Sequence, residues 1–132
     1  MPHLQFEINR PLTDPDKQAF AQQVRQLFAQ TMDTATDHIS ITIREYDTYN
    51  ISVGRVTHPE QGVALVNADI REGRTMQQRR TLCLGFMELL HQQWKIPKEH
   101  MYVTLTEHKG EDFHLLERYL ASWQEGEDPL AD

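Results

Sequence analysis

The sequence has one cysteine, Cys83, among 132 residues, so no disulfide can form within the chain. No apolar run approaches the roughly 20 residues that a membrane-spanning helix needs. The first residues, MPHLQFEI, lack the basic and apolar regions of a secretory signal peptide. Positive charge is scarce as well, since 13 Lys and Arg against 20 Asp and Glu give a net charge of −7. These features predict a cytoplasmic protein, and they argue against a membrane or nucleic-acid partner.

The remaining composition is that of an ordinary globular protein. Hydrophobic residues make up 39% of the chain and charged residues 25%. A length of 132 residues predicts a single domain, spanning 1–132, with one modest core. The seven histidines do not have the spacing of metal ligands, so no metal site is predicted.

The chain contains an internal repeat. Residues 2–51 align with residues 64–113 at an offset of 62, without a gap. Apolar positions at helical spacing stay in register between the two copies. The matched helix positions are Phe20 with Leu82, Ala21 with Cys83, Val24 with Phe86, Leu27 with Leu89, and Phe28 with Leu90. This pattern predicts an internal duplication.

Each copy has the pattern of a strand, a helix and a second strand. The expected strands are His3–Ile8, Ile39–Glu45, Ala64–Ile70 and Met101–Glu107. Thr13 and Thr75 are expected to cap the helices, which should end near Met32 and Trp94. We therefore predict an α+β fold: a four-stranded, mostly parallel-paired sheet with both helices on one face. The other face is expected to be covered by assembly with further copies.

The stretch IREGRT places Arg71 and Arg74 at the turn between a strand and a helix. A guanidinium binds a carboxylate through two parallel hydrogen bonds, and the helix N-terminus adds positive potential. The first copy has Asn9 and Leu12 at the equivalent positions. The pattern is therefore typical of a single anion site in the second copy, with ordinary surface charge as the alternative.

Four features resemble the tautomerase superfamily: Pro2 directly after the initiator Met1, the duplicated β-α-β unit, the motif IREGRTMQQRRTL, and the segments YNISVG and EDF, which resemble a turn and an apolar active-site residue of these proteins. Small members of that superfamily are single units related to 4-oxalocrotonate tautomerase. Longer members are fused pairs, such as cis-3-chloroacrylic acid dehalogenase, malonate semialdehyde decarboxylase and macrophage migration inhibitory factor. The resemblance covers about residues 2–113 and implies the β-α-β fold of these proteins and a homotrimer.

The resemblance also implies a set of site residues. Pro2 would be the catalytic amine once Met1 is removed, and Arg71 and Arg74 would bind a substrate carboxylate. Phe113 would be an apolar residue of the pocket, although it could equally belong to the core. Asp37 lies near the position of an assisting acid in the decarboxylase pattern, but a carboxylate there is more often a turn residue. Pro2 itself could simply begin an edge strand.

An N-terminal amine can act as a base, because its reference pKa is roughly 8 and burial or nearby positive charge lowers that value. The predicted activity is keto–enol tautomerisation of a small 2-oxo or enol acid with Pro2 as the general base. One alternative is decarboxylation, hydration or dehalogenation of a 3-oxo or unsaturated acid by a cationic Pro2. Another is a non-catalytic binding or assembly module.

One departure from the dehalogenase pattern affects these alternatives. In that pattern a helix histidine, a strand tyrosine and a glutamate beyond it activate water. The corresponding positions here are Ala29 or Phe28, then Thr104, and a position between Glu111 and Leu115. The absence of this set makes water-dependent chemistry a weaker prediction than proton transfer by Pro2.

Overall fold

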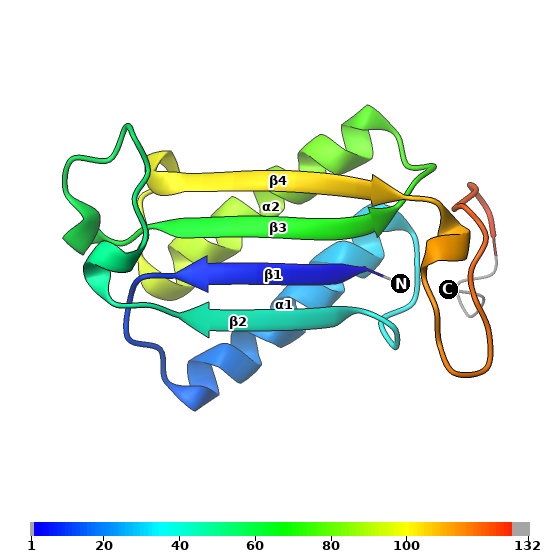
Figure 1. Cartoon of the computed structure of the whole chain (residues 1–132), viewed down its shortest axis with the longest axis horizontal. Coiled ribbons are helices and arrows are strands. Elements are labelled where there is room, and N and C mark those ends of the chain that lie inside the picture. Colours follow the sequence, from blue (N-terminus) through cyan, green and yellow to red (C-terminus); the bar gives the residue numbers. More distant parts are fainter. Residues whose placement is uncertain (1, 128–132) are drawn as a thin grey trace.

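The computed structural model describes residues 2–127 as one sheet backed by two helices (Figure 1). Met1, whose removal Pro2 chemistry requires, lies outside the described residues. The principal elements are β1 (His3–Ile8), α1 (Asp14–Met32), β2 (Ser40–Glu45), β3 (Ala64–Arg71), α2 (Met76–Trp94) and β4 (Met101–His108). The strand boundaries agree with the predicted ranges to within one residue. Within residues 2–127, no helix is long and apolar enough to cross a membrane.

The four strands lie in the order β2-β1-β3-β4. β1 pairs in parallel with β2, and β3 pairs in parallel with β4. The central pair, β1 and β3, is antiparallel. Both helices lie on the same face of the sheet (Figure 1). The predicted α+β architecture with mostly parallel pairs is therefore confirmed.

The two helices begin and end in the same way. Thr13 accepts a hydrogen bond from the backbone N–H of Asp16, and Thr75 forms a reciprocal capping box with Gln78. These side chains satisfy backbone donors that the first turn leaves free. At the other end, Asp33 and Lys95 adopt left-handed conformations with φ of 51° and 58°. Both helices thus stop after 19 residues.

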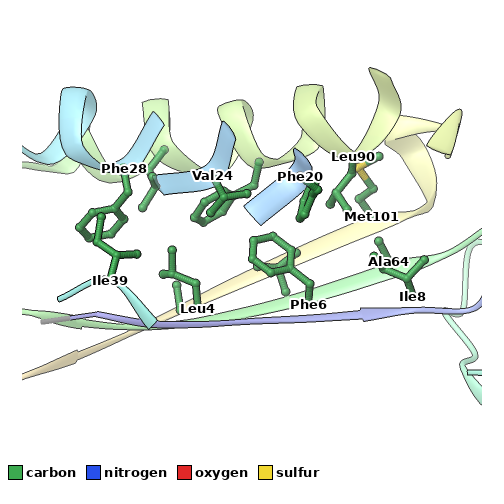
Figure 2. Close-up of a cluster of buried hydrophobic side chains, with 14 of the residues drawn as sticks. Leu4, Phe6, Ile8, Phe20, Val24, Phe28, Ile39, Ala64, Leu90 and Met101 are labelled. Carbon is green, nitrogen blue, oxygen red and sulfur yellow. The ribbon is translucent and has the colours of Figure 1, made fainter. Parts of the chain in front are cut away.

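The core lies between the sheet and the helices. Figure 2 shows Leu4, Phe6 and Ile8 of β1 pointing toward apolar side chains of the helix layer. Phe6 packs edge-on against Phe20, with ring centroids 5.0 Å apart, and against Phe86 at 5.4 Å. Such edge-to-face pairs stabilise a core beyond the area that they bury. The Phe6 ring of β1 therefore packs against both helices.

The face of the sheet opposite the helices is polar. Asp69 of β3 accepts hydrogen bonds from Gln5 Nε2 at 3.3 Å and from Asn67 Nδ2 at 3.3 Å. His3 Nε2 lies 2.7 Å from Thr42 Oγ1. Side chains alternate between the two faces of a strand, which accounts for this separation of polar and apolar residues.

After β4 the chain folds back along one end of the sheet (Figure 1). We call residues 119–127 of this segment the C-terminal strap. Its backbone approaches two glycines closely. A Cβ at Gly73, where φ is +125°, would lie 2.1 Å from the Trp123 carbonyl oxygen, and one at Gly110 would lie 2.0 Å from the Ala121 carbonyl carbon. Only glycine fits at such contacts, so Gly73 and Gly110 allow the backbone of the strap to pack this closely.

Candidate active site

The strand directions bring the start of the chain to the end of the β3 strand. His3 of β1 pairs with Ser40 of β2 and with Asp69 of β3, while Arg71 of β3 pairs with His108 of β4. The N-terminal ends of β1 and β2 therefore lie at the same end of the sheet as the C-terminal ends of β3 and β4 (Figure 1). As a result, four segments that are distant in sequence meet at this end of the sheet.

Pro2 lies in the wall of an open hollow at this end. The hollow has a volume of about 420 Å³ and is lined by Pro2, His3, Ser40, Asp112, Phe113 and His114. Pro2 is buried, and its carbonyl accepts a hydrogen bond of 3.0 Å from the backbone N–H of Ser40. This bond continues the β1–β2 pairing by one residue, so the proline ring has a fixed position.

Phe113 forms part of the same wall. Its ring packs edge-on against His108, with ring centroids 5.6 Å apart. His108 Nε2 in turn lies 2.8 Å from Asp69 Oδ1. Phe113 thus contacts both the hollow and an Asp–His pair on the polar face. This pair could not be identified from the sequence, because its members lie on different strands and only the strand register brings them together.

Asp37 lies in the turn between α1 and β2. Its side chain is exposed, and Asp37 is not one of the residues that line the hollow. Asp37 therefore lies near the start of β2, at the same end of the sheet as Pro2, but the structure does not bring it into the wall of the hollow. Its assignment as an assisting acid stays a hypothesis.

Arg71 was expected to bind a ligand, but its side chain is almost completely buried, with only 2% of its surface exposed. Its Nη1 donates to the carbonyl of Ala121 at 2.6 Å. Its Nη2 lies 3.2 Å from both carboxylate oxygens of Glu127. The guanidinium therefore already holds an anion, and the C-terminal strap supplies that anion.

Arg74 points toward the helix layer and is 5% exposed. Its Nε and Nη2 donate to the carbonyl of Met32, the last residue of α1, at 3.1 and 3.0 Å. Its guanidinium carbon lies 4.6 Å from the ring centroid of Trp123. Although the two arginines are close in sequence, their forks contact different groups: Arg71 holds the strap, and Arg74 joins the strap to the end of α1.

Other positions bear on the alternatives. Phe28 is buried in the core and faces the sheet, and Ala29 packs against the same core, so neither candidate for that position of the dehalogenase pattern lines the hollow. Burial raises the pKa of the Cys83 thiol on α2, which opposes a nucleophilic role for this cysteine. Among residues 2–127, no group of three or more His, Cys, Asp and Glu side chains is arranged to hold a metal ion.

Comparison with known proteins gives no match in sequence but a clear match in structure. No family model matches the chain, and no curated protein matches it either. Among solved structures, N1, a member of the cis-3-chloroacrylic acid dehalogenase family, superposes with a TM-score of 0.81. The match covers 91% of this chain and 84% of that one, at 20% identity. This chain has the tautomerase-superfamily fold.

Two further structures show how widely the tautomerase fold is matched. Q0 fused 4-OT, a wild-type symmetric trimer, has a TM-score of 0.76, and the match covers 98% of this chain and 97% of that one at 19% identity. FG41 malonate semialdehyde decarboxylase inhibited by 3-bromopropiolate has a TM-score of 0.71, with coverage of 84% and 86% at 14% identity. At these identities the likeness establishes the fold, and the reaction has to be argued from the site.

Proposed function

We propose that this protein is a cofactor-independent keto–enol tautomerase of the tautomerase superfamily. Its substrate is a small acid with a 2-oxo or enol group next to the carboxylate. Pro2 is the general base after removal of Met1. Arg71 binds the substrate carboxylate, Arg74 contributes positive charge beside it, and Phe113 forms the apolar wall.

One observation carries this proposal. The register of β1 against β3, in which His3 pairs with Asp69, puts Pro2 at the end of the sheet where β3 ends with Arg71, although the Arg71 side chain is not in the wall of the hollow. A base and an anion-binding group are the two parts that proton transfer next to a carboxylate requires. Phe113 lines the hollow together with Pro2, which adds an apolar surface for the carbon skeleton of the substrate.

The chemistry follows from the properties of a secondary amine. A free α-amino group has a pKa of roughly 8, and the burial of Pro2 would favour the neutral form of the amine. Neutral Pro2 nitrogen removes a proton from C3 of the 2-oxo acid, and the electron pair becomes the C2=C3 bond. The carbonyl oxygen takes up the negative charge, which a guanidinium stabilises, and then takes a proton from the protonated Pro2 nitrogen, which becomes neutral again. Ketonisation is the same sequence in reverse.

The decarboxylase alternative is favoured by the similarity to FG41 malonate semialdehyde decarboxylase. In that case a cationic Pro2 would polarise a 3-oxo group while the carboxylate leaves as carbon dioxide, with Asp37 assisting. The exposed position of Asp37, away from the hollow wall, makes this the second hypothesis. A hydratase or dehalogenase would additionally need a group that activates water. A non-catalytic module on this fold would tolerate the loss of Pro2.

We also propose that the working protein is a homotrimer. The support is the similarity to Q0 fused 4-OT, which is a symmetric trimer. Trimer formation would cover the polar face of the sheet, where Gln5 and Asn67 both donate hydrogen bonds to Asp69. A cytoplasmic location is expected because the chain has a single cysteine.

The test is ketonisation of phenylenolpyruvate, followed by absorbance, in protein shown by intact mass to lack Met1. Pro2→Ala and Arg71→Lys should lose most of the wild-type rate. Pro11→Ala and Arg55→Ala replace exposed residues of the same types and should keep it. Equal rates in the wild type and Pro2→Ala would refute the role of Pro2. If the wild type shows no rate above buffer, decarboxylation of malonate semialdehyde is the next activity to measure.

A further inference from the structure

The C-terminal strap covers the arginine end of the sheet through several bonds. Arg71 holds the Ala121 carbonyl and the Glu127 carboxylate. The Trp123 backbone N–H donates to the Glu72 carbonyl at 3.0 Å. The indole N–H of Trp123 donates to the Asp33 carbonyl at 3.3 Å. The strap is therefore bound to the turn after β3 and to the turn after α1.

The carboxylate of Glu127 is placed where an incoming carboxylate would have to bind. Both of its oxygens lie 3.2 Å from Arg71 Nη2. Its Oε1 also accepts a bond of 2.8 Å from the backbone N–H of Gln124. The Glu127 side chain is 21% exposed, whereas the Arg71 side chain is 2% exposed. Solvent therefore reaches this pair from the side of the glutamate.

Removing Glu127 without a replacement would take a carboxylate away from a buried guanidinium, which is unfavourable. Exchanging one carboxylate for another keeps the charge at Arg71 balanced. A substrate with a carboxylate can make this exchange, whereas an ester or amide of the same skeleton cannot.

We propose that Glu127 is a specificity-determining residue that competes with the substrate carboxylate for Arg71. This inference rests on the proposed function, in which Arg71 binds the substrate. The strap carries an internal anion, substrate binding displaces Glu127 from Arg71, and product release restores the pair. The strap thereby admits only ligands that bring their own negative charge.

Glu127→Gln is the direct test, because it removes the charge while keeping an oxygen that can accept the bond from Gln124. We expect KM for phenylenolpyruvate to fall roughly tenfold with kcat little changed, because the substrate carboxylate then no longer has to displace a charged group from Arg71. Glu125→Gln removes the same charge from an exposed position two residues away, and should leave KM unchanged. Circular dichroism would verify that each variant is folded.

The affinity for pyruvate, measured by calorimetry, separates this inference from the proposed function. Tighter binding of pyruvate to Glu127→Gln than to Glu125→Gln supports competition, whether or not the protein turns over phenylenolpyruvate. An active wild type with an unchanged or raised KM in Glu127→Gln would overturn the inference and leave the tautomerase proposal in place. An inactive wild type would refute the tautomerase proposal, and equal or weaker pyruvate binding by Glu127→Gln would then refute the competition as well.

Discussion

Replacement of Arg74 by alanine should destabilise the fold, because this side chain holds three segments together. Its Nε and Nη2 donate to the carbonyl of Met32 at the end of α1. Its guanidinium stacks 4.6 Å from the ring centroid of Trp123 in the strap. Arg74 itself lies in the turn between β3 and α2. Alanine leaves the Met32 carbonyl without this donor and removes the surface on which the indole packs.

The magnitude follows from these contacts. A hydrogen bond from a charged donor contributes about 1.5–3 kcal/mol. A cation–π contact adds about 0.5–2 kcal/mol, and a positive charge at a helix C-terminus adds about 0.3–1 kcal/mol. Removal of a buried charge recovers part of its desolvation cost. We therefore expect the free energy of unfolding to fall by about 2–4 kcal/mol in Arg74→Ala.

Urea denaturation, with the slope of the transition compared between variants, measures this change. Arg74→Lys keeps the charge but loses the planar fork, so it should lie between alanine and the wild type. Arg80→Ala removes an exposed arginine from α2 and should change stability by no more than about 0.5 kcal/mol. A loss in Arg74→Ala as small as that in Arg80→Ala would refute this account and would favour Arg74 as a group available to a ligand.

Three other predictions concern local chemistry. Gly73→Ala should cost at least about 1 kcal/mol in urea denaturation, because φ is +125° and its Cβ would meet the Trp123 carbonyl; wild-type stability would contradict the seating of the strap. Burial raises the pKa of Cys83, so its alkylation by iodoacetamide at pH 8 should be slower than in urea-unfolded protein, and equal rates would refute this. Hydrogen bonding to Lys98 lowers the pKa of Glu88. The stabilisation from Glu88 should therefore be present above the ordinary pKa of glutamate and be lost as pH falls through the lowered pKa. The difference in free energy of unfolding between the wild type and Glu88→Gln should shrink over that range, and a difference that stays constant from pH 7 to pH 3 would contradict the pairing.

The elements of the fold were predictable because their signals are local. The apolar positions of α1 and α2 recur at helical spacing, and those that the structure buries include Phe20, Phe28, Leu82 and Leu90. Thr75 with Gln78 indicates a capping box from two letters of sequence, and the structure contains it. Such signals depend only on residues within a few positions of one another.

The candidate site was only partly predictable, because it depends on contacts across the whole chain. The strand pairing could be expected to place Pro2 near Arg71 only once the tautomerase fold was recognised. The directions of Arg71 and Arg74 could not be predicted, since a turn separates them and each fork is fixed by a distant partner. Glu127 lies in an acidic segment without periodicity, and nothing local in the sequence links it to Arg71. The contact between Glu127 and Arg71 forms only because the strap folds back along the end of the sheet.

The central claim is that Pro2 carries a free, nucleophilic amine at the working site, and covalent labelling tests it most directly. The reagent is an acetylenic 2-oxo acid, 2-oxo-3-pentynoate. An amine adds to the triple bond of such a compound, and the amine proton ends on the neighbouring carbon. Treated protein would be digested and its peptides analysed by mass spectrometry, with Cys83→Ala as a control for thiol addition. The account predicts one adduct on Pro2 that forms with loss of tautomerase activity. An unmodified Pro2 in Met1-free protein, or an adduct confined to Cys83, would contradict it.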